Sequence, residues 1–235
     1  MSLEQITDDS AISIATDIRP LPAVIHENGA SRVEIFNGPD GIYARKTVKA
    51  PAMFGIRISG MARYLCAREV GILEKLQGVE GVQQLIEQDS PTSFISRYID
   101  GKTLKQTQQV PPEYFDKLSR ILESVHGRGI ADLDFAHSDD LLVDKKGNPW
   151  IIDLTASVIC EPGSNLFTRL AFDYVCKLNK TYLLRRKAKY ALGALTLDEQ
   201  RQAETIGALA TTWRSLQAMK RYVKYEIIGQ SHKSG

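Results

Sequence analysis

Five aspartates stand close together between residues 126 and 155, separated by apolar runs that are typical of short strands. The five are Asp132, Asp134, Asp139, Asp140 and Asp153. The first four fall in a predicted loop, and the fifth closes a predicted strand after a turn at residues 144–148. Mg²⁺ is a hard cation that prefers oxygen ligands. Carboxylates that loop and strand ends bring together therefore predict a magnesium-phosphate site.

A lysine and a glutamate nearer the N-terminus occupy positions where the pattern predicts apolar surfaces. In the strand predicted over residues 42–48, Lys46 shares a face with Ala44 by the two-residue period. Glu69 falls on the apolar stripe of a helix predicted over residues 61–76. A buried ammonium group needs a partner, so a Lys46–Glu69 pair is one interpretation. The other is that both side chains reach solvent at the edge of the core.

The first part of the chain predicts a small antiparallel sheet. Residues 23–49 are strand-like and are broken by two glycine-containing turn signals, which predicts a meander of about three strands. After the helix that carries Glu69, two more strands are predicted near residues 82–87 and 93–99. Residues 1–22 are polar and mildly acidic, and they predict a lead-in or an edge strand.

The remainder predicts helices around the acidic loop. A connector at residues 100–102 leads to a helix that Pro111-Pro112 opens and that ends near Gly127. Beyond the fifth aspartate the pattern is helical again, with a capping box at residues 196–199. Strands first and helices second predict an α+β fold of two lobes. The predicted parts are a lead-in of residues 1–22, an N-lobe of residues 23–100 and a helical C-lobe of residues 101–235.

Composition and charge exclude several classes of protein. With 235 residues, 43% hydrophobic and 25% charged, the chain is ordinary globular material. A net charge of +2 is too small to indicate a nucleic-acid partner. Cys66, Cys160 and Cys176 match neither a disulfide framework nor a zinc site. There is no signal pattern and no run of roughly 18 apolar residues, so we expect a cytoplasmic protein, at most peripheral at the inner face of a membrane.

The order of these features resembles the protein-kinase-like fold. It runs from Lys46 through Glu69 and a connector at residues 97–101 to the acidic loop and Ile-Ile-Asp153, and it covers about residues 28–155. The segment HGRGIADLDFAHSDDLLVD is most similar to small bacterial atypical kinases of the RIO type or the lipopolysaccharide-kinase-like family. The resemblance implies a sheet-rich N-lobe and a reduced helical C-lobe.

The resemblance also implies catalytic roles. Asp134 takes the place of the catalytic-loop aspartate, which orients the acceptor hydroxyl and accepts its proton. Asp153 takes the place of the aspartate that holds Mg²⁺ between the phosphates. Lys46 would contact the α- and β-phosphates of ATP, and Glu69 would hold it in position. ATP and Mg²⁺ are the implied cofactors.

A nucleotide site is implied by the same match. Its parts are a phosphate-covering turn, the lysine strand and a hinge whose Arg97 carbonyl and Ile99 N–H face the adenine. The implied nucleotide-binding residues are Gly29, Ser31, Val33, Ala44, Lys46, Arg97 and Ile99.

Four positions depart from the usual kinase pattern. Asp132 stands in place of the loop histidine, and Asp140, or Asp139 in another alignment, stands in place of the metal-binding asparagine. Thr155 replaces the glycine of Asp-Phe-Gly, and Gly29 is the single glycine of the phosphate-covering turn. Aspartate is a competent Mg²⁺ ligand, so the metal site survives these changes.

Two other functions therefore stay open beside an active kinase. The departures are also typical of a pseudokinase that works as an interaction module without catalysis. The Asp-Leu-Asp tripeptide at residues 132–134 could be the metal-binding motif of a sugar-nucleotide transferase, although this leaves the lysine strand unexplained.

The end of the chain bears on the acceptor and the partners. Only 82 residues follow Asp153, which favours a small, lipid-linked or sugar acceptor over a protein docked on a long activation segment. A Ser/Thr hydroxyl stays open as an acceptor. Residues 177–190 hold six basic residues, no acidic one and interleaved leucines. This pattern predicts either a face for a membrane surface or anionic glycolipid, or a solvated helix whose leucines are core. Nucleic acid is disfavoured because no stacking motif accompanies the charge.

Overall fold

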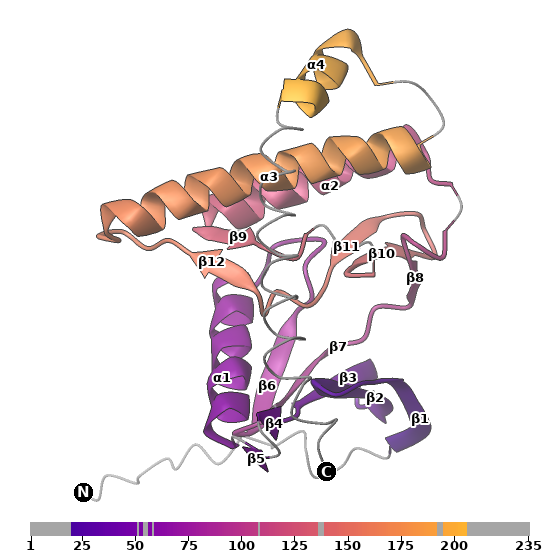
Figure 1. The fold of residues 1–235 in the computed structure, drawn as a ribbon. Coiled ribbons are helices and arrows are strands. Elements are labelled where there is room, and N and C mark those ends of the chain that lie inside the picture. The colour runs from indigo at the N-terminus through magenta and orange to yellow at the C-terminus, as the bar shows by residue number, and fades with distance from the viewer. Residues whose placement is uncertain are drawn as a thin grey trace, which may run out of the picture.

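The computed structural model describes residues 20–50, 52–53, 56–57, 59–107, 109–135, 139–191 and 195–205. The chain forms a sheet-rich first lobe and a helical second lobe, drawn below and above in Figure 1. Of the predicted lead-in, residues 1–19 lie outside the described residues, and Pro20 opens the first strand. That strand is an edge strand, as one of the two interpretations had it.

The first lobe contains a five-stranded antiparallel sheet in the order β1-β2-β3-β7-β6. Its strands are β1 (Pro20–Glu27), β2 (Ser31–Gly38), β3 (Gly41–Val48), β6 (Leu85–Ser90) and β7 (Ser93–Arg97). β4 (Ala52–Met53) and β5 (Ile56–Arg57) pair separately. Asn28 Oδ1 accepts the N–H groups of Ala30 and Ser31, both at 2.8 Å, and closes the β1–β2 turn. The predicted meander is confirmed.

Helix α1 (Ser59–Lys75) packs against β3, β6 and β7. Its buried side forms a small core with the sheet, in which Cys66 and Leu73 meet Val48 and Phe94. Glu69 lies on this buried side although it is charged. The helix therefore delivers a carboxylate to the interior, where it requires a partner.

The second lobe is built on two long helices that lie side by side, α2 (Pro112–Gly127) and α3 (Leu166–Tyr190) (Figure 1). The predicted apolar stripe of α2 is buried almost throughout. Three short strands form one sheet, β8 (Gly101–Thr103), β10 (Leu141–Asp144) and β11 (Pro149–Ile151). A second sheet pairs β9 (Ile130–Asp132) with β12 (Ser157–Ile159). The predicted capping box begins α4 (Leu197–Thr205), since Thr196 and Glu199 bond reciprocally.

The predicted connector at residues 100–102 is wrong in part. Gly101 and Lys102 belong to β8, which pairs with Asp144 and Val143 of β10. A side chain at Gly101 would place its Cβ 2.6 Å from the Val143 carbonyl oxygen, so glycine permits the pairing. The connection between the two lobes is therefore reduced to residues 98–100.

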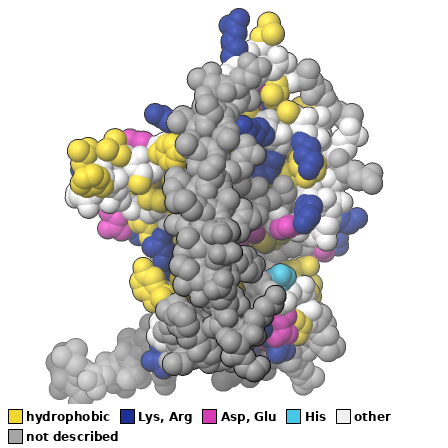
Figure 2. All heavy atoms as spheres, viewed as in Figure 1, with side chains coloured by type: hydrophobic (Ala, Val, Ile, Leu, Met, Phe, Trp, Pro, Cys, Tyr) yellow, Lys and Arg dark blue, Asp and Glu magenta, His cyan; other side chains and the backbone are white. Residues whose placement is uncertain are grey.

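The basic stretch at residues 177–190 lies within α3. Leu178, Leu183 and Leu184 are buried, and so is Arg186. The interpretation of these leucines as core is confirmed, and they offer no apolar face to a membrane. Figure 2 shows apolar side chains gathered at the opposite, projecting end of α3, where Leu166, Phe167 and Leu170 are exposed. In the part of the chain that the structure describes, no helix is long and apolar enough to cross a membrane.

Candidate active site

Lys46 lies at the centre of the candidate site. It stands on β3 opposite Val33 and Phe94, and its side chain is 11% exposed. Its Nζ lies 2.8 Å from Glu69 Oε1 and 2.8 Å from Asp153 Oδ1. The Lys46–Glu69 pair is therefore formed, and the aspartate that follows β11 joins it from the other lobe.

The pKa values of these groups follow from burial and neighbouring charge. Burial on its own would lower the pKa of Lys46, but the carboxylates of Glu69 and Asp153 outweigh it and the pKa is raised. Burial would raise the pKa of Asp153, but the charge and hydrogen bond of Lys46, together with Thr155, bring it below its ordinary value. The Lys46–Asp153 contact is thus an ion pair at neutral pH.

Thr155 also belongs to this network. In the sequence it stood out only because it replaces the glycine of Asp-Phe-Gly. Its Oγ1 lies 2.8 Å from Glu69 Oε2, 2.7 Å from Asp153 Oδ1 and 3.4 Å from Lys46 Nζ. Arg68 Nε donates to the Thr155 carbonyl at 3.4 Å and its guanidinium also reaches the Ser157 carbonyl. The segment after Asp153 is therefore held to α1 through both backbone and side chain.

Thr155→Val should lower the free energy of unfolding by about 1–3 kcal/mol, because it keeps the shape of the side chain but removes a hydroxyl next to the buried Glu69 carboxylate. Urea denaturation measures the change. Thr155→Ser keeps the hydroxyl and is the matched control. Equal losses in both variants would assign the effect to packing and not to the hydrogen bond.

The backbone at Asp153 is unusual. Its φ is +56°, and among the described residues it is the one non-glycine residue with a positive φ. Aspartate and asparagine tolerate this left-handed region better than most residues. The side chain is nevertheless 46% exposed and turned to Lys46. Such conformations persist where the surroundings hold them, and they concentrate at functional sites.

Asp132 holds the acidic loop in place through hydrogen bonds. It is buried, its Oδ1 accepts the N–H of Asp134 at 3.0 Å, and its carbonyl accepts Nδ2 of Asn179 at 2.7 Å. Its Oδ2 has no hydrogen-bond partner among the described residues. Burial raises the pKa of Asp132 to about 7. These contacts give Asp132 a structural role in fixing the loop that carries Asp134.

Asp139 and Asp140 have different surroundings. Asp139 Oδ2 lies 3.1 Å from Lys105 Nζ, and its side chain is 56% exposed. Asp140 is half-buried, and its carbonyl accepts the N–H of Ile152 at 3.0 Å. Burial, followed by the charge of Asp153, raises the pKa of Asp140 to about 8. Of the two alternatives for the second metal ligand, Asp140 is the one whose pKa is raised by the charge of Asp153.

Neither the family models nor the curated proteins contain a match to the sequence. Among solved structures, a similar fold is found in the Rio2 kinase of Chaetomium thermophilum, whose structure is described as an ADP/Mg²⁺-phosphoaspartate complex. The TM-score is 0.54 and the identity 18%, over 82% of this chain and 63% of the other. This chain has a protein-kinase-like fold. The predicted fold class is confirmed, and this chain spans less than two thirds of the length of that kinase.

The fold brings several predicted nucleotide-binding residues to one side of the sheet. Val33 lies opposite Lys46, and Ser31 lies opposite Val48, so the turn that contains Gly29 is at the Lys46 end of β3. Ala44, on the same strand, is buried. Ser31, Val33 and Ala44 therefore lie on the same face of the sheet as Lys46.

The predicted hinge residues lie at the other end of β3. The guanidinium of Arg97 pairs with Asp40 at 2.8 Å and stacks 5.0 Å from the ring centroid of Tyr43. The Arg97 side chain is thus engaged at the surface, so the predicted adenine contact would depend on its backbone carbonyl. Ile99 is half-buried and lies in the short connection between β7 and β8.

The carboxylates of Asp140 and Asp153 suit a magnesium ion that is bound to a nucleotide. Among the described residues, no group of three or more histidine, cysteine, aspartate or glutamate side chains could hold a metal. Mg²⁺ in phosphate sites is commonly bound by one or two carboxylates, with phosphate oxygens and waters completing its shell. Asp140 and Asp153 are the candidates for such a pair, because the charge of Asp153 raises the pKa of Asp140 and a divalent cation would relieve this repulsion.

Arg186 is a further residue whose place the sequence did not predict. It belongs to the basic stretch of α3 but is buried, with its guanidinium 5.2 Å from the ring centroid of Phe135. Burial lowers its pKa to about 10, against the opposing charges of Asp140 and Asp132. Phe135 directly follows Asp134, so the guanidinium of Arg186 places a positive charge next to the acidic loop. Nothing in its local sequence distinguishes it from Lys177, Lys180 and Lys189 of the same stretch, which are exposed.

Proposed function

We propose that this chain is an ATP- and Mg²⁺-dependent phosphotransferase of the atypical kinase type. The observation that supports it best is the position of Lys46 Nζ, 2.8 Å from both Glu69 Oε1 and Asp153 Oδ1. Phosphoryl transfer depends on positioning and on charge stabilisation more than on covalent chemistry. A buried, oriented lysine beside an exposed carboxylate provides both.

Each residue has a defined part in the proposed reaction. Lys46, oriented by Glu69, binds the α- and β-phosphates, while Asp153 and Asp140 would hold Mg²⁺, which would supply positive charge to the phosphate oxygens. Asp134 orients the acceptor hydroxyl and takes its proton as the acceptor oxygen bonds to the γ-phosphorus. The bond from that phosphorus to the bridging oxygen breaks, and ADP leaves.

The acceptor is proposed to be a small, sugar or lipid-linked hydroxyl, or a Ser/Thr hydroxyl, in keeping with small bacterial RIO-type or lipopolysaccharide-kinase-like proteins. Support comes from exposed cations at Lys177, Lys180 and Lys189 of α3. These cations suit an anionic acceptor without insertion into a membrane. We place the reaction in the cytoplasm, at the inner face of the membrane when the acceptor is lipid-linked.

Thermal shift with ATP, GTP and a uridine-diphosphate-sugar, each with and without Mg²⁺, tests the class of ligand. A ligand at roughly 100 times its Kd adds about 2.7 kcal/mol to stability. We expect Mg²⁺–ATP to give the largest shift, and γ-labelled ATP to label a glycan, lipid or protein fraction of a bacterial extract. A shift with ATP but no transfer would identify a pseudokinase. A shift with the nucleotide-sugar alone would identify a sugar-nucleotide transferase.

The apparent affinity for Mg²⁺–ATP should rise with pH between about 6 and about 9. The pKa of Asp140 is raised to about 8, so below that pH Mg²⁺ must displace a proton from its carboxyl group. Titration calorimetry across this range measures the effect. Asp140→Asn should weaken binding and flatten the pH dependence, whereas Asp139→Asn should retain both. The reverse result would move the second metal ligand to Asp139.

A further inference from the structure

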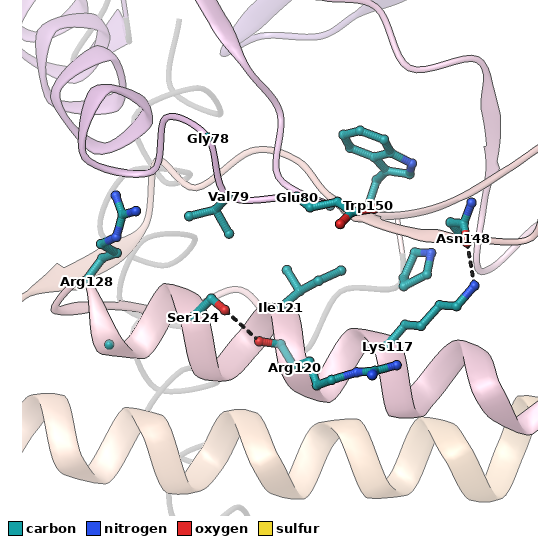
Figure 3. Close-up of a pocket in the computed structure, with 13 residues that line it drawn as sticks. Gly78, Val79, Glu80, Lys117, Arg120, Ile121, Ser124, Arg128, Asn148 and Trp150 are labelled. Atoms are coloured by element: carbon teal, nitrogen blue, oxygen red, sulfur yellow. Dashed lines mark hydrogen bonds between the residues drawn. The ribbon is translucent and has the colours of Figure 1, made fainter.

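A cavity of about 810 Å³ lies away from the Lys46 site. Its walls come from the loop that follows α1, from one side of α2 and from the start of β11 (Figure 3). None of the residues that line it belongs to the candidate active site. Its volume is in the range of small-molecule sites in proteins.

The lining combines an apolar floor with a cationic rim. Val79, Ile121 and Trp150 provide the apolar part, and Figure 3 shows Ile121 pointing from α2 into the space between Val79 and Trp150. Lys117, Arg120 and Arg128 provide three positive charges. The lining contains one acidic residue, Glu80, in the loop after α1.

The three cations are not neutralised by carboxylates within the described part of the chain. Lys117 Nζ donates to the amide oxygen of Asn148 at 2.6 Å, and Arg128 donates to the carbonyl of Lys75. Neither they nor Arg120 form a salt bridge among the described residues. The partners of Lys117 and Arg128 are neutral oxygens, so these groups keep their positive charge.

The wall opposite α2 is held by its own hydrogen bonds. Gly81 has a φ of +80°, and a Cβ there would lie 2.1 Å from Cδ1 of Ile121, so glycine permits this close approach. Ile151 N donates to the Gly81 carbonyl at 2.8 Å. The side chain of Gln84 bonds the carbonyls of Val79 and Val82 and accepts from the backbone of the same loop. The loop that forms this wall is therefore fixed by hydrogen bonds.

We propose that this cavity is a second ligand site, which binds a small anionic molecule with an aromatic or aliphatic body, such as an aryl or alkyl carboxylate, sulfonate or phosphate ester. The apolar body contacts Ile121 and Trp150, and the anionic group meets Lys117 and Arg120, which lie one turn apart on α2 at the same end of the cavity (Figure 3). Charge-assisted contacts to such groups are stronger than neutral ones. Binding here does not require the chain to transfer phosphate.

The location also connects the ligand to both halves of the candidate active site. The loop at residues 78–81 ends the helix that carries Glu69, and β11 ends two residues before Asp153. A molecule in the cavity contacts both segments at once. It would therefore stiffen the two supports on which the Lys46 network depends.

The test uses the full chain and 8-anilinonaphthalene-1-sulfonate, whose fluorescence rises in apolar surroundings. Its uncharged counterpart of similar shape is N-phenyl-1-naphthylamine. We expect one sulfonate probe to bind per chain, and the neutral probe to bind about tenfold more weakly, which corresponds to about 1.4 kcal/mol. Equal affinity for the two probes would overturn the assignment of an anionic ligand.

Variants locate the probe. Ser124 lines the cavity and is exposed, so Ser124→Trp should place an indole in the space and weaken binding. Arg120→Gln should weaken binding about tenfold through the loss of one charge-assisted contact. Lys102→Gln removes an exposed cation that does not line the cavity and should leave binding unchanged. Melting temperatures check that each variant is folded.

Two results would overturn the site. One is undiminished binding of the sulfonate probe in both Ser124→Trp and Arg120→Gln. The other is an equal loss of binding in Lys102→Gln, which would assign the effect to net charge. If Ser124→Trp is poorly folded, Arg120→Gln against Lys102→Gln still decides the question, because both remove one exposed charge from a surface position.

Discussion

Asp153→Asn should reduce phosphate transfer by about 10²–10³-fold or more, the scale seen when one oriented charge-stabilising group is removed from an active site. Asparagine tolerates the φ of +56° found at this position, so the backbone should be retained. The amide removes the charge that pairs with Lys46 and weakens the ligand available to Mg²⁺. Steady-state transfer and the Mg²⁺–ATP thermal shift should fall together.

The control for this substitution is Asp139→Asn. It also replaces a loop aspartate by its amide, but Asp139 pairs with Lys105 near solvent and lies outside the Lys46 network. Its transfer rate should stay near that of the unmodified chain. Transfer that persists in Asp153→Asn would remove this residue from the metal site and contradict the proposed mechanism.

Lys46→Met should lower the free energy of unfolding by about 3–5 kcal/mol, the usual cost of leaving a buried charge without its partner. Glu69 is buried, and Lys46 is its cationic partner in the network. The double variant Lys46→Met with Glu69→Gln should recover most of the loss, because the remaining amide carries no charge. Urea denaturation of the two single variants and the double variant gives the coupling energy.

The pH dependence of stability is a second test of the Lys46–Glu69 pair. Burial raises the pKa of Glu69, and in Lys46→Met no ammonium opposes that effect. The folded state then holds a proton that the unfolded chain releases near its ordinary pKa of about 4.3. Stability of Lys46→Met should therefore fall as pH rises above that value. A loss that is the same at every pH would show that Glu69 is not the source of the instability.

Local patterns were sufficient to predict the sheet and the lysine. The period of two places Lys46 on a buried face, and the stripe in α1 places Glu69 toward it, so one ion pair satisfies both. The turn signals at Asn28 and Gly41 lie at the β1–β2 and β2–β3 connections of the structure. These features depend on residues near each other in the chain, and for that reason the sequence reveals them.

Contacts between distant segments were not predictable in this way. Thr155 meets Glu69 across 86 positions, and only the docking of α1 on the segment after Asp153 creates that contact. Arg186 resembles its basic neighbours, and its burial depends on how α3 packs over Phe135. The positive φ of Asp153 likewise results from the surrounding network, because aspartate alone does not require it.

The two lobes are joined by the chain itself and by hydrogen bonds between segments that are distant in the sequence. Residues 98–100 form the covalent connection, where Tyr98 N donates to the Ile42 carbonyl at 3.1 Å. Close to it, Arg97 N donates to the Gln84 carbonyl at 2.9 Å, and Ile151 bonds to Gly81 and to Gln83. These backbone contacts gather near the covalent connection, so a rotation of the first lobe about that region would break the Lys46–Asp153 contact before it disturbs the connection. Under the proposed function, such a rotation would accompany nucleotide exchange.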